Sequence, residues 1–305
     1  MKNLKYVFKP TALILLWVFL FVQPDPLFGY ETINVTNGGS VIGKVTLKGA
    51  IPMPRVFPVG IYPFSFYCKK IADGENNVLL DEFFVGTAGG VKDAIVTVQN
   101  VQKGKPFPDL KASMIAVDCM FHPGDASPSE YNIAQPDKTI HHEHPLVTVL
   151  ANHESISLIN KDPIIHNMQV FQNEKGNIIL NTPLPVSNEP RGGILSFEKG
   201  NRIIHMICGM HEFMQSWAYV VDNPYYANTK KDGEFIIDRL PPGTYQVVVW
   251  HPHLKPISRE VTISANRPTE VNFEFDSSEV KRPIYESQDS FRTFPKDRMP
   301  EHMHH

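Results

Sequence analysis

The chain of 305 residues has few cysteines, no excess of basic residues and no long amphipathic helical stretch. The missing helical periodicity, together with 26 prolines and 19 glycines, argues against a helical protein and favours a turn-rich, all-β chain. A formal net charge of −3 provides no basic face, which argues against binding to nucleic acid. The length leaves room for two modest domains.

Long apolar runs are also scarce, since one run, Thr11–Val22, stands alone near the N-terminus. Lys2, Lys5 and Lys9 precede it and Gly29 follows, which predicts a signal peptide over residues 1–29. An uncleaved anchor is the alternative, because the run lacks an A-x-A cleavage site. We expect an exported, periplasmic body with no stable membrane insertion after cleavage, whose net charge is −5 once three lysines and one aspartate are removed.

The three cysteines are Cys68, Cys119 and Cys208. An odd number in an exported chain leaves one thiol without a cysteine partner. If Cys68 and Cys119 form a disulfide, Cys208 remains. A free thiol outside the cytoplasm is prone to oxidation unless it is buried or bound to a metal.

Candidate metal ligands gather around this third cysteine. Cys208, His211 and Met214 lie in "ICGMHEFM", and His166 lies upstream in "DPIIHN". One thiolate, two imidazoles and one thioether form the ligand set of a type 1 (blue) copper site. Zinc is the next candidate, although a thioether suits it less, and a site that has lost its metal is the other alternative.

The spacing of these residues is compatible with one site. Cys208 ends the apolar run "RIIHMIC", which predicts a buried strand, and His211 and Met214 follow on what we expect to be a compact loop. His166 lies 42 residues earlier and must approach from a neighbouring strand.

The C-x2-H-x2-M loop with "HN" upstream resembles the cupredoxins, and its short spacing is similar to that of amicyanin. The resemblance covers about Lys111–Asp222 and implies an eight-stranded Greek-key β-sandwich with copper at one end. It also implies that Asn167 ties the ligand loops together by hydrogen bonds. The implied copper ligands are His166, Cys208, His211 and Met214.

The same resemblance implies single-electron transfer rather than catalysis. An exposed His211 would then be the edge through which the electron leaves, towards transient redox partners such as cytochromes. Two alternatives remain: a periplasmic copper carrier without a redox role, and a structural module with a relic site. The long loop Gly124–His144 departs from a compact cupredoxin.

Other histidines are candidates for a second metal site. One group lies in or beside the long loop, and for it we favour a solvated loop over a second metal site; its members are His122, His141, His142 and His144. His251 and His253, in "WHPH", resemble the H-x-H pairs of multicopper oxidases. Those enzymes flank the copper cysteine with histidines, whereas Ile207 and Gly209 flank Cys208. This argues against a multicopper oxidase or copper nitrite reductase.

A second resemblance lies in "KKDGEFIIDRLPPGTYQVVVWHP", which is similar to carboxypeptidase regulatory-like domains, small transthyretin-like β-sandwiches. That family opens with strands like Val41–Gly49 and Ala94–Val101, which lie far upstream here. This implies a domain split in sequence by the cupredoxin segment; two sequential domains, the first over residues 30–110, are the alternative. The expected layout is a signal at 1–29, β regions at 30–110, 111–222 and 223–275, and a disordered tail at 276–305.

Overall fold

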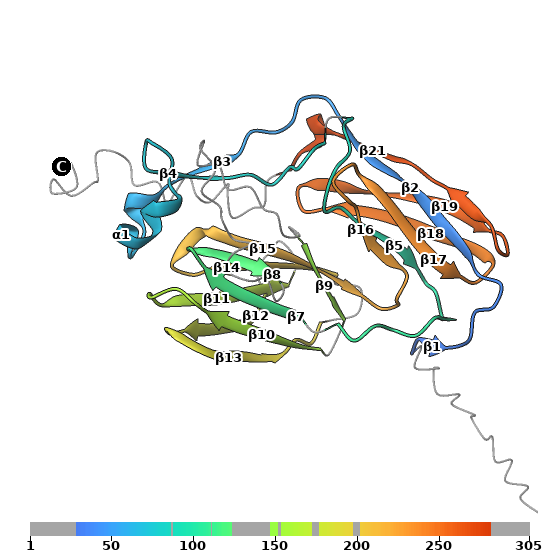
Figure 1. Ribbon diagram of the computed structural model, residues 1–305, viewed down its shortest axis with the longest axis horizontal. Helices are drawn as coiled ribbons and strands as arrows, with labels where there is room; N and C mark the ends of the chain where they lie inside the picture. The colour runs from blue at the N-terminus through green and yellow to red at the C-terminus, as the bar shows by residue number, and fades with distance from the viewer. Residues whose placement is uncertain are drawn as a thin grey trace, which may run out of the picture.

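The computed structural model describes residues 29–86, 88–110, 112–123, 147–151, 154–172, 177–197 and 202–281. The predicted signal peptide up to residue 28, the whole loop Gly124–His144 and the tail from residue 282 lie outside this range. Within it, two β-sandwiches lie side by side, with a small lobe beside one of them (Figure 1). The expected all-β architecture is confirmed.

The first sandwich consists of a four-stranded and a five-stranded sheet. The four-stranded sheet has the order β13 (Ser187–Ile194), β10 (Ser155–Asn160), β7 (Ala112–Val117), β8 (Met120–Pro123). The five-stranded sheet has the order β12 (Asn177–Leu184), β11 (His166–Gln172), β14 (Ile203–Cys208), β15 (His211–Val221), β9 (Val147–Ala151). Among the described residues, nine strands therefore occur where eight were expected.

A hairpin replaces the single strand that "KASMIAVDCMF" suggested. Strands β7 and β8 are joined through Asp118 and Cys119, which have φ angles of 54° and 55°. Two successive residues with positive φ form the tight turn that matches the twist of antiparallel strands. Apolar periodicity continues across such a turn, which is why the sequence did not reveal it.

The second sandwich combines strands that precede the first sandwich in sequence with strands that follow it. One sheet has the order β16 (Tyr226–Asn228), β5 (Ile95–Gln99), β18 (Gly243–His251), β19 (Leu254–Ile263). The other has the order β17 (Glu234–Leu240), β2 (Gly39–Lys48), β20 (Pro268–Glu270), with β21 (Phe273–Asp276) also on β2. Both β2 and β5 thus lie between strands that follow the first sandwich in sequence.

The lobe lies between β2 and β5 in sequence and packs on the first sandwich (Figure 1). It contains β3 (Arg55–Pro58), a 3-10 turn (Val59–Ile61), α1 (Ser65–Cys68), a second 3-10 turn (Lys69–Ile71) and β4 (Asn77–Leu80). Phe57, Val78 and Leu80 share the apolar core of the first sandwich. A disulfide between Cys68 and Cys119, with Cα atoms 5.6 Å apart, joins α1 to the β7–β8 hairpin.

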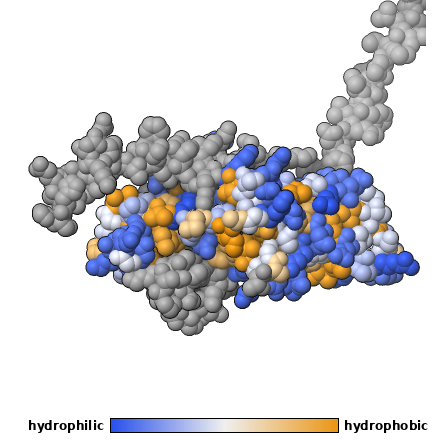
Figure 2. Space-filling model, turned by 90° about the horizontal axis from the view of Figure 1, so that it is seen from above, coloured by the Kyte–Doolittle hydropathy of each residue, from blue (hydrophilic) through white to orange (hydrophobic). Residues whose placement is uncertain are grey.

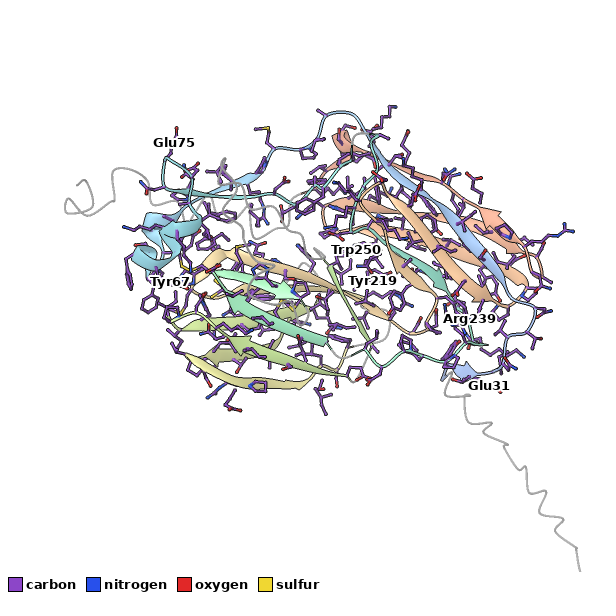
Figure 3. All side chains as sticks on the ribbon, in the orientation of Figure 1. Glu31, Tyr67, Glu75, Tyr219, Arg239 and Trp250 are labelled. Atoms are coloured by element: carbon purple, nitrogen blue, oxygen red, sulfur yellow. A yellow bond between two sulfur atoms is a disulfide. The ribbon has the colours of Figure 1, made fainter. Side chains whose placement is uncertain are left out.

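Aromatic side chains fill the junction between the sandwiches. The rings of Tyr219, on β15, and Trp250, on β18, have centroids 5.2 Å apart (Figure 3). Beside them lies a buried ionic group in which Glu82 accepts hydrogen bonds from Arg55, and Nε2 of His253 lies 2.8 Å from the same carboxylate. The lobe, the first sandwich and the second sandwich therefore meet in one buried region.

Strand β1 (Glu31–Thr32) pairs with β6 (Lys103–Gly104) near the start of the described chain. Among the described residues, no helix is both long and apolar enough to span a membrane. The face seen in Figure 2 has hydrophobic patches interspersed with hydrophilic side chains.

Candidate metal centre

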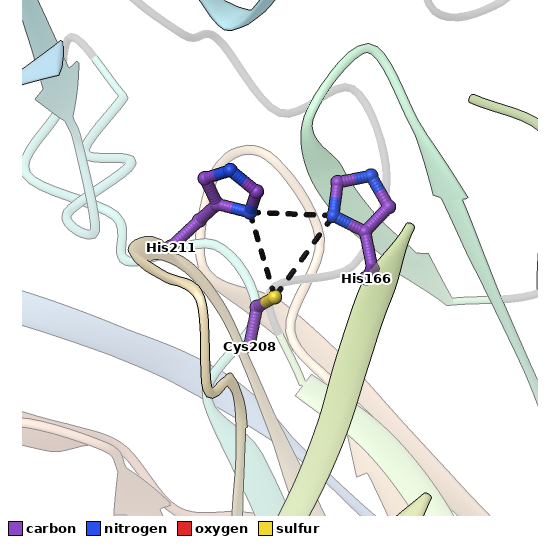
Figure 4. Close-up of side chains that lie close together, drawn as sticks. All are labelled: His166, Cys208 and His211. Carbon is purple, nitrogen blue, oxygen red and sulfur yellow. Dashed lines mark hydrogen bonds between the residues drawn. The ribbon is translucent and has the colours of Figure 1, made fainter. Parts of the chain in front are cut away.

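Three of the four predicted ligands converge at one end of the first sandwich (Figure 4). The Cys208 Sγ lies 3.9 Å from Nδ1 of His166 and 3.6 Å from Nδ1 of His211. The two Nδ1 atoms are 3.3 Å apart. Cys208 ends β14, His166 begins the adjacent β11, and His211 follows the two-residue turn after Cys208.

The outer nitrogen of each imidazole determines which nitrogen carries the proton. Nε2 of His166 lies 2.8 Å from Oδ2 of Asp162, and Nε2 of His211 lies 2.8 Å from the carbonyl oxygen of Pro63. A carboxylate and a carbonyl only accept, so both Nε2 atoms donate. In the neutral imidazoles, both Nδ1 lone pairs therefore face the sulfur.

The environment favours the thiolate of Cys208. Burial would raise the pKa of this thiol, but its contacts with His166 and His211 outweigh burial and lower the pKa to about 6. The backbone N–H of Asn167 also points to the sulfur, at 3.5 Å. Thiolate is the form of cysteine that binds metals.

The pKa of His166 is shifted by opposing effects. Burial would lower it, but the hydrogen bond to Asp162 and the contact with Cys208 outweigh burial and raise it. Burial likewise would raise the pKa of Asp162, whereas its hydrogen bonds, that from His166 first, lower it. Asp162 is therefore an ionised, acceptor-only partner.

The spacing of the three atoms fits a metal ion bound in a plane. With bonds of about 2.0 Å to nitrogen and about 2.3 Å to sulfur, a trigonal ion separates nitrogen from sulfur by about 3.7 Å and the nitrogens by about 3.5 Å. When both imidazoles are neutral, the sulfur and the two Nδ1 atoms are electron-pair donors that face one another. Such a set suits a cation, and a His2Cys plane is the arrangement typical of type 1 copper.

Met214 lies in the same buried core as Cys208. Ile207 pairs with Gln215 across β14 and β15, after which the register shifts and Cys208 pairs with His211. Met214 lies between these two pairs on β15, in the bulged segment opposite the end of β14.

Two details of the expected ligand loop were wrong. His211 and Met214 belong to the long strand β15 rather than to a loop, because the turn after Cys208 is complete at Met210. His211 is 0% exposed, because the lobe covers its outer edge with the Pro63 carbonyl and the ring of Tyr62. The imidazole therefore offers no open edge to solvent.

Asn167 joins the ligand strands through its backbone. Its carbonyl accepts from the N–H of Gly209 at 2.9 Å, while its side-chain amide donates to Asn181 on β12. The backbone of Asn167 therefore links the segments that carry His166 and Cys208, whereas its side chain, which we expected to do so, bonds to Asn181.

Sequence reasoning missed the groups that anchor the imidazoles. Asp162 stands four residues before His166, and a carboxylate near a ligand histidine is a common arrangement that could have indicated it. Pro63 contributes a backbone carbonyl from the lobe, for which the sequence carries no signal.

The other histidines do not join a second cluster of this kind within the described residues. His122, His251 and His253 are all buried, so the described part of the loop group is not solvated. The further metal-compatible group there consists of Cys119, Asp162 and His166. Its sulfur belongs to the disulfide, so the group supports the first centre rather than forming another.

Comparison with known proteins relates both parts of the chain to families. Residues 220–276 match the family model of the carboxypeptidase regulatory-like domain. No curated protein matches the chain. Among solved structures, a purple cupredoxin from Nitrosopumilus maritimus is 16% identical, with a TM-score of 0.24, over 36% of this chain and 100% of that one.

Two further structures are of related kinds. A reduced amicyanin variant is 12% identical, with a TM-score of 0.23, over 41% of this chain and 98% of its own. A copper-containing nitrite reductase from Thermus scotoductus is 13% identical, with a TM-score of 0.25, over 38% of this chain and 24% of its own. The chain thus contains a carboxypeptidase regulatory-like domain at residues 220–276, and its structural neighbours are cupredoxins.

Proposed function

We propose that this is an exported type 1 copper protein that carries single electrons between redox partners and is not itself an enzyme. The observation that supports this most is the buried convergence of one thiolate and two imidazole lone pairs on a single point. Bound copper would supply a one-electron couple between its cupric and cuprous states.

The chain's own residues favour rapid exchange. Cys208, His166 and His211 would hold the copper ion, and Met214 is the fourth residue that we propose as a ligand. Their outer hydrogen bonds keep them in place without the metal, so both oxidation states meet nearly the same geometry. Little rearrangement would accompany the transfer of an electron.

The covered His211 suggests where a partner receives the electron. Its Nε2–H donates to the Pro63 carbonyl, and this hydrogen bond joins a proposed ligand directly to the lobe. We infer that a transient partner, such as a cytochrome, docks on the lobe rather than on the ligand itself. Export and a periplasmic location belong to the same proposal, because the Cys68–Cys119 disulfide suits an oxidising compartment.

The test is visible absorbance and electron paramagnetic resonance of the copper-loaded protein. We expect an intense charge-transfer band from the Cys208 thiolate, which Cys208→Ser abolishes. The unfolded, unreduced protein should give one titratable thiol and the variant none, which verifies the change. A colourless copper-loaded wild type, or tight cuprous binding without redox activity, would contradict the electron-transfer role and favour a copper carrier.

A further inference from the structure

We propose that Asp162 is a positioning residue of this centre: its buried carboxylate, held by the disulfide-bonded hairpin, fixes His166 and lowers the copper reduction potential. The inference rests on the proposed function and names a residue beyond the four ligands. It follows from four hydrogen bonds that meet on one carboxylate.

Asp162 is saturated by donors from three segments. Its Oδ2 accepts from Nε2 of His166 and from the N–H of Cys119, both at 2.8 Å. Its Oδ1 accepts from the Tyr67 hydroxyl at 2.8 Å and from the N–H of Asp118 at 2.7 Å. The side chain is fully buried, so water does not compete with these bonds.

The disulfide places most of these donors. Cys68 ends α1, which carries Tyr67, and Cys119 lies in the hairpin turn whose two N–H groups point to the carboxylate. The covalent bond therefore links the helix and the turn on either side of Asp162. Since Asp162 in turn holds His166, the hairpin supports the metal centre without touching the metal.

A fixed negative charge behind one ligand has a defined electrostatic effect. It stabilises the cupric ion more than the cuprous ion, because the cupric ion carries the larger positive charge. Burial increases this effect, since the interaction is weakly screened. The hydrogen bond also keeps the proton on Nε2, which leaves Nδ1 available as a ligand.

The decisive variant is Asp162→Asn, which keeps the shape and removes the charge. An amide nitrogen would face N–H or O–H donors in either orientation, so the four hydrogen bonds cannot all be kept and the hold on His166 weakens. We expect copper affinity to fall about 10- to 100-fold. Because the cupric form loses more, the potential should rise by about 59 mV for each tenfold difference. Tyr67→Phe keeps the charge and should give a smaller rise.

Glu212→Gln is the matched control, because it removes one carboxylate beside the other histidine ligand. Glu212 accepts from the Tyr62 hydroxyl at 3.3 Å and is partly exposed, so we expect little change in potential. A metal-free readout is the nitrogen NMR spectrum of His166, recorded at a pH where its imidazole is neutral, which should show Nδ1 unprotonated in the wild type and mixed tautomers in Asp162→Asn.

The outcomes separate this inference from the proposed function. A blue wild type with an unchanged potential and unchanged His166 tautomer in Asp162→Asn overturns the role of Asp162 alone. Equal shifts in Asp162→Asn and Glu212→Gln overturn it as well, because any nearby charge would then suffice. A wild type without the charge-transfer band overturns the proposed function, while the NMR readout still decides whether Asp162 positions His166.

Discussion

At the residue scale, the centre depends on groups that lie behind its ligands. His166 is held by Asp162, His211 by the Pro63 carbonyl and the Cys208 sulfur by a backbone N–H. Each contact fixes the direction of one ligand atom before any metal arrives. The site is therefore held close to the geometry that the proposed metal ion would need, which would reduce the entropy lost on binding.

Met214 gives a prediction that isolates the axial position. Met214→Leu removes the thioether while nearly conserving volume, so we expect less than about 1.5 kcal/mol of destabilisation. Because the axial ligand tunes a type 1 site, the reduction potential and the visible spectrum should change. Cyclic voltammetry and absorbance of the loaded variant measure both.

The control for this variant is Met206→Leu. Met206 is a buried methionine two residues before Cys208 and belongs to the same core. The Met206→Leu variant should leave the visible spectrum and the reduction potential unchanged. If both variants behave alike, Met214 is only a core residue.

The candidate ligand residues could be singled out from the sequence because their chemistry is unusual and three of them lie close together in the chain. Cys208, His211 and His166 were all recognised, and the structure brings their ligand atoms together. The exposure of His211 could not be predicted, since the cover comes from a lobe about 150 residues earlier in the chain and acts through a backbone carbonyl. Asp162 could have been proposed from its place four residues before His166, because a ligand histidine commonly donates its outer N–H to a carboxylate.

At the scale of elements, the lobe packs as part of the first sandwich, although it precedes that sandwich in sequence. Its apolar residues complete that core, and α1 is joined to the β7–β8 hairpin by the disulfide. A short lobe of two strands and single helical turns has little core of its own. The covalent link compensates by restricting the unfolded chain.

This leads to a prediction for Cys68→Ala/Cys119→Ala. The two cysteines are 51 residues apart, and loop-closure entropy for that separation corresponds to about 4 kcal/mol. The free energy of unfolding, from denaturant titration, should fall by roughly that amount.

The same double variant should also take up and release copper faster, because the lobe over His211 is less firmly held. Chelator competition followed by absorbance measures the rate. Loss of stability without faster exchange would mean that the lobe does not limit access to the site.

The strand pattern was accurately predicted where apolar alternation ended at a glycine or proline turn. The Asp232–Gly233 turn and the strands around it occur as expected, and Gly233 has a φ of 77°. The hairpin at Asp118–Cys119 was missed because neither residue is a glycine. Only the Asp162 carboxylate, distant in sequence, shows why two positive φ angles are stabilised there.

At the scale of the whole molecule, buried charges hold the parts together. Glu82 pairs with Arg55 from the lobe and with His253 from the second sandwich, while Arg55 also donates to Gln215 on β15. His251 is buried close by and stacks on Phe83. Removing one partner of such a group would leave a buried charge uncompensated, which is strongly destabilising.

The junction predicts acid lability. Burial lowers the pKa of His251 from 6.5 to about 3, so below about pH 6.5 the unfolded chain takes up a proton that the folded chain resists. Burial would raise the pKa of Glu82, but His253 and Arg55 lower it below its usual range, so this contribution is also lost on acidification. Stability should therefore fall steadily below about pH 6.5.

Denaturant titrations between pH 8 and pH 4 measure this loss. His251→Asn keeps an acceptor for the His253 N–H and removes the titrating imidazole. The variant should lose less stability on acidification than the wild type. An equally steep loss would assign the effect to other groups.

The divided second sandwich gives a prediction about fragments. Residues 220–276 span the whole family match, yet the sheets they form lack β2 and β5. β5 pairs with both β16 and β18, so the fragment keeps one unfilled position in each sheet. Far-UV circular dichroism should show it largely unfolded.

A control fragment in which residues 38–50 and 90–105 are linked ahead of residues 220–276 restores the missing strands. It should fold cooperatively. A stably folded short fragment would show that β2 and β5 are dispensable.

The division also sets an order of events during biosynthesis. Val45 pairs with Phe273, so β2 emerges long before its partner strand is made. All strands of the inserted sandwich are available first, and its contacts are more local, which favours early folding. Until their partner strands are made, the N-terminal strands have unpaired edges, and unpaired edges favour aggregation. We therefore expect folding of this chain to rely on a chaperone that shields β2 and β5 until the last strands arrive.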